Sequence, residues 1–127
     1  MTDLTARQQE IKDAFVEQRG TWSPLWESIL RLDPEFLLSY LDFSMVPWKK
    51  NHLDAKTKEL MYIAVDAAAT HLYVPGLKLH YENALGYGAT VGELLEVLEI
   101  ASVIGIHAAT TAVPILVEEL EARGTDF

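Results

Sequence analysis

Apolar residues recur along most of this chain at the three- and four-residue spacing of an amphipathic α-helix. The spacing is clear in a segment that begins near Ala6, where Ile11 and Phe15 share one face. It returns in the segments 55–70 and 107–122. The sequence has no run in which apolar and polar residues alternate as they do in a half-buried β-strand. The pattern therefore predicts an all-α protein.

Helix-capping signals divide the chain into about six helices. A side chain that accepts a hydrogen bond from the first turn marks a helix start, and a following proline or a later Glu or Gln strengthens the signal. The starts predicted in this way are Thr5 with Gln8, Ser23-Pro24, Asp33-Pro34, Asp54, and Thr90 with Glu93. Glycine predicts helix ends at Gly20, Gly86, Gly88 and Gly124. We also expect a break at Pro75-Gly76 and a bend at Gly105.

Length and composition indicate one globular domain over residues 1–127. Half of the residues are hydrophobic and 23% are charged, as in ordinary globular proteins. The chain has no cysteine, which excludes disulfides, zinc–thiolate sites and thiol redox catalysis.

The net charge of -9 makes nucleic acid a poor partner, because the phosphate backbone would be repelled. The polar N-terminus does not resemble a secretory signal. No apolar run approaches, on this reading, the roughly 18 residues that a membrane span needs. We therefore expect a cytoplasmic protein that binds neither nucleic acid nor membrane.

The segment 55–70 is apolar on most sides, so we expect it to lie at the centre of the fold or at a subunit interface. Two acidic residues interrupt it. Glu59 follows Lys56 and Lys58, which favours a solvated face. Asp66 stands among apolar residues, and a hydrogen bond to Thr70, one turn further on, would account for it.

Among the four histidines, His80 is the candidate for chemistry because its neighbours place it toward the apolar side of its helix. A half-buried imidazole can donate or accept a proton at cellular pH. The alternative is a core histidine whose ring is satisfied by a backbone carbonyl. His71, His80 and His107 are candidate metal ligands, but no two histidines have the spacing that presents two ligands from one helix, so we expect no metal site.

The segment 53–119 resembles the carboxymuconolactone decarboxylase family, which includes the alkylhydroperoxidase D-like proteins. The resemblance rests on Asp54-Ala55-Lys56-Thr57-Lys58-Glu59-Leu60, Gly76-Leu77-Lys78-Leu79-His80, Asn83-Ala84-Leu85, Gly88-Ala89-Thr90, Glu96-Val97-Leu98 and Gly105-Ile106-His107-Ala108-Ala109. It implies the all-α alkylhydroperoxidase D-like fold, with residues 1–50 adding N-terminal helices that resemble no family we can name.

The peroxidase branch of this family carries the motif Cys-x-x-Cys-x-x-x-His. In this chain His80 takes the histidine position, while Tyr73 and Gly76 take the cysteine positions. Neither residue can form a thiolate, so the protein is not a thiol peroxidase. The family's glutamate corresponds to Glu59 if the following loop is two residues longer here.

The cysteine-free branch resembles γ-carboxymuconolactone decarboxylase. This resemblance implies a lyase, decarboxylase or isomerase that uses no cofactor and acts on a small cyclic or aromatic-derived acid or lactone. It also implies a homo-oligomer, a trimer or hexamer. His80 and Glu59 are then the expected catalytic residues, with His71, Tyr73 and His107 as expected substrate-binding residues. Because the net charge of -9 repels an anionic substrate, we expect either a locally positive pocket or a substrate that is less charged than the family name suggests. The alternative is a non-catalytic, oligomeric binding or accessory protein that lacks the redox cysteines.

Overall fold

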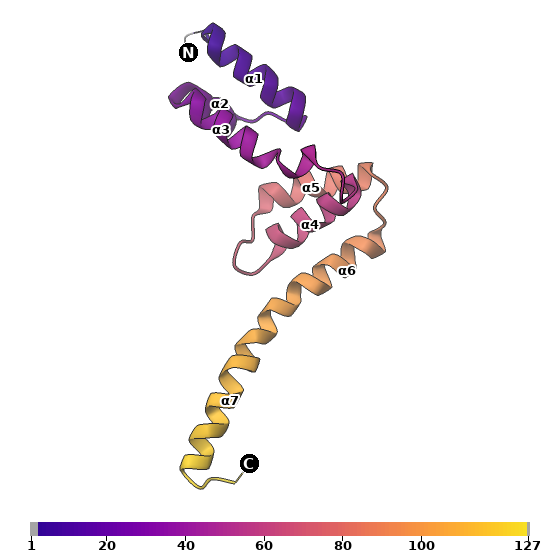
Figure 1. Ribbon diagram of the computed structural model, residues 1–127. Helices are drawn as coiled ribbons and strands as arrows, with labels where there is room; N and C mark the ends of the chain where they lie inside the picture. Colours follow the sequence, from indigo (N-terminus) through magenta and orange to yellow (C-terminus); the bar gives the residue numbers. More distant parts are fainter. Residues whose placement is uncertain (1–2, 127) are drawn as a thin grey trace. The chain divides into compact units, whose positions relative to one another are not determined.

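The computed structural model describes residues 3–126, and these residues form α-helices and short 3₁₀ segments without any β-strand. The predicted all-α class is therefore confirmed. Three elements run on without a gap from Val91 to Ala122 (Figure 1). If these three elements are counted as one helix, the described residues form six α-helical stretches, as predicted.

Contacts divide the chain into two compact units, one ending at His52 and the other beginning at Leu53. The division falls where the resemblance to the decarboxylase family begins. Each unit has its own buried cluster of apolar side chains. The prediction of a single domain over residues 1–127 stays a prediction.

The first unit contains α1 (Ala6–Arg19), α2 (Pro24–Leu32), α3 (Pro34–Ser44) and the 3₁₀ segment η1 (Pro47–Lys49). Its three α-helices begin at the predicted caps, and Gly20 ends α1 in the left-handed conformation. Their buried faces supply the core residues Ile11, Phe15, Leu30, Leu37 and Leu41.

The tryptophans of α2 and of the turn before it pack around this core. Trp22 meets the ring of Phe15 edge-on, with centroids 5.3 Å apart. Trp26 stacks on Tyr40 at 5.2 Å. Because both indoles are packed against aromatic side chains of the same unit, they contribute to folding and form no open ligand cage.

The second unit contains α4 (Ala55–Ala67), α5 (Val74–Gly86), α6 (Val91–Ser102), η2 (Val103–Ile106) and α7 (His107–Ala122). The helix α4 contacts both α5 and α6. The predicted caps at Asp54 and Thr90 are confirmed, the latter as a complete capping box. The buried core is Ile63, Ala84 and Ala89, and side chains of α4, α5 and α6 pack against it.

Three boundaries differ from the prediction. The helix α4 ends at Ala67, three residues before Thr70. Pro75 and Gly76 do not break the chain but lie in the first turn of α5, where a proline costs no backbone hydrogen bond. Gly105 lies in η2, so the expected bend is a stretch of tighter 3₁₀ helix.

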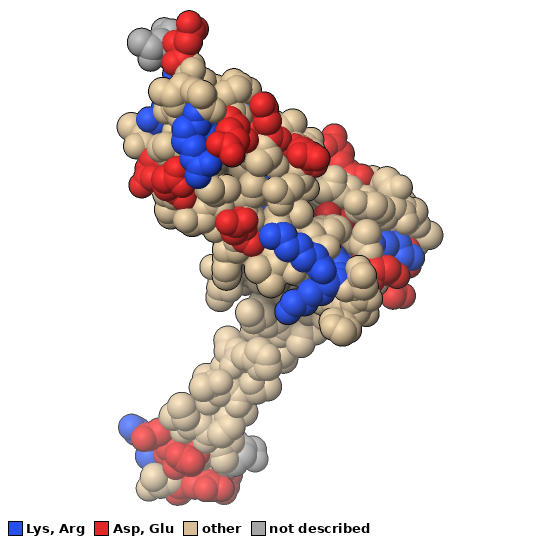
Figure 2. Space-filling model, turned by 45° about the horizontal axis from the view of Figure 1, so that its top comes forward, with Lys and Arg blue, Asp and Glu red and all other residues tan. Residues whose placement is uncertain are grey.

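The expectation that no apolar run reaches membrane-spanning length is wrong. No charged residue occurs between Ile100 and Val117, and the helix from Val91 to Ala122 is, by length and composition alone, apolar enough to cross a membrane. The core helix of a soluble protein passes the same test. Within the single chain this apolar window is not buried at all. Figure 2 shows the uncharged stretch of α7, with charged side chains gathered at its C-terminal end.

Candidate active site

A carboxylate and an imidazole meet between α4 and α5. The Nδ1 atom of His80 lies 2.5 Å from Oε2 of Glu59. The Nδ2 atom of Asn83 donates a hydrogen bond of 3.1 Å to Oε1 of the same carboxylate. The Glu59 side chain is only 3% exposed and that of His80 13% exposed. The solvated-face interpretation of Glu59 is therefore wrong, because the residue is buried with two polar partners.

Helical spacing brings these groups together. On α4, Glu59, Ile63 and Asp66 are buried in succession at spacings of four and three residues, so they share one face. On α5, His80 and Asn83 are three residues apart and face that row. The polar pair thus lies beside the apolar core of the second unit.

Tyr62 of α4 covers one side of the His80 ring. The two rings are stacked, with centroids 4.6 Å apart and planes 8° from parallel. The stack and the bond to Glu59 together hold the imidazole in one orientation. Its Nδ1 atom is directed at Glu59 and its Nε2 atom lies on the opposite edge of the ring.

A second carboxylate lies on that opposite edge. Oδ2 of Asp66 is 3.8 Å from Nε2 of His80, and Oδ1 of Asp66 is 3.3 Å from Nε2 of His71. The predicted hydrogen bond from Asp66 to Thr70 is wrong. Because α4 ends at Ala67, Thr70 does not lie one helical turn beyond Asp66, and the carboxylate turns toward the two imidazoles instead.

The loop between α4 and α5 is hydrogen-bonded to the backbone of Asp66. The backbone N–H of Tyr73 donates a 2.8 Å hydrogen bond to the carbonyl oxygen of Asp66. The ring of Tyr73 lies against that of His71, with centroids 5.6 Å apart. Both of these side chains are exposed, so they form the solvent-facing end of the site.

The structure thus brings together four of the five predicted site residues: His80, Glu59, His71 and Tyr73. His107 begins α7 and is exposed, and none of the described contacts joins it to this group. Sequence reasoning missed Tyr62, although its place three residues after Glu59 puts it beside the same helix face. It also assigned Asp66 the wrong partner.

The charged groups that contact His80 are carboxylates. A locally positive pocket therefore depends on protonated His71 and His80. No group of three or more His, Asp and Glu side chains in the described part of the chain is placed to hold a metal ion.

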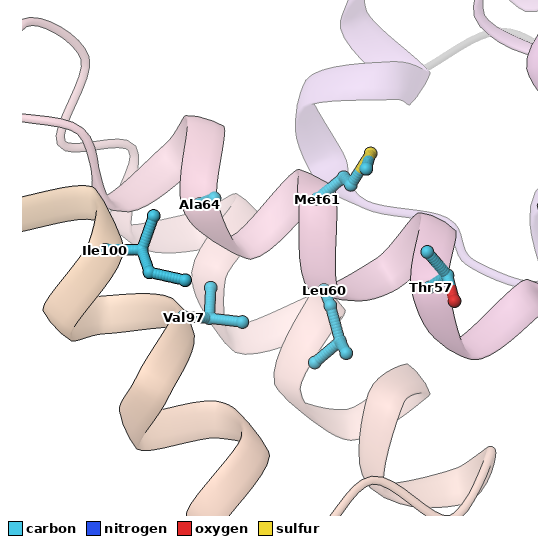
Figure 3. Close-up of a pocket in the computed structure, with 6 residues that line it drawn as sticks. All are labelled: Thr57, Leu60, Met61, Ala64, Val97 and Ile100. Carbon is cyan, nitrogen blue, oxygen red and sulfur yellow. The ribbon is translucent and has the colours of Figure 1, made fainter.

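An open apolar hollow of about 200 Å³ lies between α4 and α6, on the side of α4 away from Glu59 and Asp66. Figure 3 shows the side chains of Leu60 and Val97 between the two helices. The lining residues are Thr57, Leu60, Met61, Ala64, Val97 and Ile100. This lining has no charged group that would orient a carboxylic acid, whereas Glu59 and Asp66 lie on the other side of α4.

The sequence model of the carboxymuconolactone decarboxylase family matches residues 34–118. The chain therefore belongs to this family, as the sequence motifs predicted. The match begins at Pro34, the first residue of α3, and so it reaches further toward the N-terminus than residue 53, where the recognised motifs begin.

A crystal structure from Burkholderia xenovorans LB400 is similar over nearly the whole chain. It is provisionally assigned as a γ-carboxymuconolactone decarboxylase subunit. The two proteins are 52% identical with a TM-score of 0.86, and the alignment covers 96% of this chain and 49% of the other. The present chain thus spans about half the length of that protein. No curated protein matches the sequence.

Proposed function

We propose that this protein is a cofactor-independent lyase, a decarboxylase or related isomerase, that acts on a small cyclic or aromatic-derived carboxylic acid or lactone. The observation that carries the proposal is the buried Glu59–His80 pair, oriented by the Tyr62 ring. Family membership supports it, as does the name given to the similar crystal structure. Because the chain has no cysteine, this pair cannot serve a thiol peroxidase.

In this proposal His80 supplies the proton that replaces carbon dioxide. The substrate loses its carboxylate as CO2, and the electron pair left on carbon spreads onto the neighbouring carbonyl oxygen. His80 hydrogen-bonds that developing oxyanion or protonates the carbon, which forms the new C–H bond. Glu59 holds the imidazole through Nδ1 and stabilises the imidazolium before the transfer. His71 and Tyr73 bind the substrate at the exposed end of the site.

We further infer that the protein is a homo-oligomer, a trimer or hexamer, that serves aromatic catabolism in the cytoplasm. The similar crystal structure is described as a subunit, which favours assembly. The unburied apolar window that includes α7 favours it too, since large apolar surfaces on soluble proteins mark sites of association. The partner surface in this proposal is a second copy of the same chain.

The second candidate is a non-catalytic binding or accessory protein. One observation favours it. Glu59 accepts bonds from both His80 and Asn83 and so ties α4 to α5, which is a structural role that needs no substrate. The two functions predict different effects of replacing His80: loss of ligand binding and turnover for the lyase, and loss of thermal stability alone for the accessory protein.

The test compares wild type, His80→Gln and His52→Gln by thermal unfolding with a panel of small carboxylic acids and unsaturated lactones. His52 is exposed and lies in the other unit, so its variant controls for loss of a histidine. A bound ligand at 100 times its dissociation constant adds about 2.7 kcal/mol of stability. We expect a ligand that stabilises wild type and His52→Gln but not His80→Gln.

Turnover of that ligand should then fall by about 10²–10⁴-fold in His80→Gln, which is the usual range for loss of a general acid. It should stay unchanged in His52→Gln. If no compound stabilises wild type while His80→Gln alone melts early, the lyase proposal fails. The accessory role then takes its place.

A further inference from the structure

We propose that His71 and Asp66 form a proton path from solvent to His80. Four titratable side chains follow one another in the second unit: His71, Asp66, His80 and Glu59. Their exposed fractions are 51%, 10%, 13% and 3% in that order. The series therefore begins at a group in contact with bulk water and leads to the buried pair.

The order of the groups suits proton transfer. Imidazoles and carboxylates alternate, so each group that can donate a proton is followed by one that can accept it. An imidazole can receive a proton at one nitrogen and release another from the opposite nitrogen. His80 has its two nitrogens directed at two different carboxylates, Glu59 at 2.5 Å and Asp66 at 3.8 Å.

The separation of 3.8 Å is about 1 Å longer than a working hydrogen bond. A modest rotation of the Asp66 side chain toward His80 closes it, and rotation back returns Oδ1 toward His71, 3.3 Å away. The carboxylate can thus pick up a proton at one end and deliver it at the other. In this path the Asp66 side chain rotates while α4 holds its backbone.

Gly76 leaves the space in which the Asp66 carboxylate lies. A Cβ atom at position 76 would lie 2.0 Å from Oδ2 of Asp66, so any other residue there would push the carboxylate aside. At the exposed end, Leu72 adopts a positive φ of 48°, a left-handed conformation that is strained for a non-glycine residue. Such strain is found where the surrounding structure fixes a loop, here the loop that carries His71.

The proton path rests on the proposed function, because a decarboxylase is what would need a supply of protons at His80. Replacing CO2 by hydrogen consumes one proton in each turnover, and His80 must recover that proton before the next substrate reacts. Tyr62 covers one face of His80, and Glu59 at its Nδ1 is itself buried. The remaining edge, at Nε2, leads through Asp66 to His71. Asp66 acts through His80 and is therefore a positioning residue in the proton supply. His71, which the proposed function assigns to substrate binding, is the solvent end of the same path.

The path can be tested without any substrate. In full-length protein labelled with ¹⁵N-histidine, nuclear magnetic resonance measures the rate at which the His80 Nε2–H proton exchanges with water. The variants are Asp66→Asn and His71→Gln, which keep size and remove proton transfer. His107→Gln is the control, since His107 is exposed and none of the described contacts joins it to His80.

We expect exchange at His80 to slow by roughly tenfold or more in Asp66→Asn and His71→Gln, the scale on which removed acid–base groups act. Added imidazole buffer should restore part of the rate in His71→Gln, because a small carrier can replace an exposed side chain. A purely structural role would give no such rescue. Equal exchange rates in wild type and both variants would overturn the path, as would equal slowing in His107→Gln.

Failure of the path and failure of the lyase proposal are distinguishable. Slowed exchange in the variants, with no turnover of any acid or lactone, supports the path and contradicts the lyase. Turnover that depends on His80 but is insensitive to Asp66→Asn contradicts the path and supports the lyase. Gly76→Ala provides a second variant, because it retains every titratable group, while its Cβ would meet the Asp66 carboxylate at 2.0 Å and the ring of Tyr73 at 2.6 Å. Its exchange rate should fall as well, and an unchanged rate with a displaced carboxylate would overturn the path.

Discussion

Gly76 of α5 and Asp66 of α4 are packed so closely that a Cβ atom at position 76 would lie 2.0 Å from Oδ2 of the aspartate. Position 76 is the one that corresponds to the second cysteine of the peroxidase motif. In this chain a carboxylate from the neighbouring helix lies against it. Oδ2 of the same carboxylate lies 3.8 Å from Nε2 of His80, so this packing places an acid group beside the histidine of the candidate site.

Gly76→Ala should therefore destabilise the protein. The added methyl group would meet Oδ2 of Asp66 at 2.0 Å and Cδ1 of Tyr73 at 2.6 Å, so these side chains must shift, and overpacking of this kind costs about 1–3 kcal/mol. Urea unfolding measures the loss. Gly92→Ala in α6 is the control, because its Cβ would meet only a hydroxyl oxygen at 3.8 Å and alanine favours a helix. If Gly76→Ala is as stable as Gly92→Ala, the close packing against Asp66 is disproved.

Removing Glu59 should cost more stability than neutralising it. Glu59→Ala leaves His80 and Asn83 without their shared partner in a buried place, for which we expect a loss of about 3–5 kcal/mol. Glu59→Gln keeps an acceptor oxygen and should lose less. Denaturant unfolding of both variants measures the difference. Exposed Glu82 on α5 gives the control Glu82→Ala, expected within about 0.5 kcal/mol of wild type. A loss no larger in Glu59→Ala than in this control would contradict a buried pair.

The ion pair between Lys56 and Glu93 should make stability depend on pH in the acid range. The two charges are 2.8 Å apart and join the first turns of α4 and α6. The hydrogen bond from Lys56, followed by the backbone N–H of Thr90, lowers the pKa of Glu93 below its usual value of 4.5. A lowered pKa contributes stability above the unfolded-state pKa, and this stability disappears as the pH falls through the folded-state pKa.

Glu93→Gln keeps the capping box but removes the charge. The variant should melt below wild type at pH 7, and the difference should shrink toward zero as the pH falls below 4.5 and through the lowered pKa of Glu93. Melting curves at a series of pH values measure it. Glu96→Gln, on an exposed position of the same helix, is the control. A difference that stays constant from neutral to acid pH would show that Glu93 does not act through its charge.

The helix starts were predictable because their signals are local. Thr5 and Gln8, or Thr90 and Glu93, satisfy each other's backbone groups within four residues, so no distant contact can change the outcome. The fold class followed from the same local information. The predicted break at Pro75 failed for an equally local reason, since proline ends a helix in its interior but is accepted in its first turn.

The site was less predictable because its partners are distant in sequence. Glu59 appeared solvated beside two lysines, but α5 covers it, and His80 lies 21 residues further along the chain. The resemblance to the family pointed to the pair where periodicity did not. For Asp66 the error came from the helix end: three more residues of α4 would have placed Thr70 within reach. No local pattern indicates that the carboxylate turns toward His71 and His80.

The apolar surface of α7 should be covered by other copies of the chain in solution. Light scattering at micromolar concentration should give a mass several times the 14.2 kDa of one chain. Val113 and Leu116 are exposed in the uncharged stretch, and aspartate at both positions would place charges in the proposed subunit contact. We expect Val113→Asp/Leu116→Asp to lower the measured mass.

Glu119→Lys, beyond the uncharged stretch, is the control and should leave the assembly intact. A wild-type protein of monomer mass would contradict the subunit contact. Sedimentation with phospholipid vesicles then distinguishes two possible roles of this helix, which are membrane binding and contact between copies of the chain. Because membranes also bind apolar helices, a monomer that sediments with vesicles and loses this binding in the double variant would assign the helix to lipid. A wild-type oligomer that stays in the supernatant, and loses mass in the double variant, would assign α7 to the contact between copies.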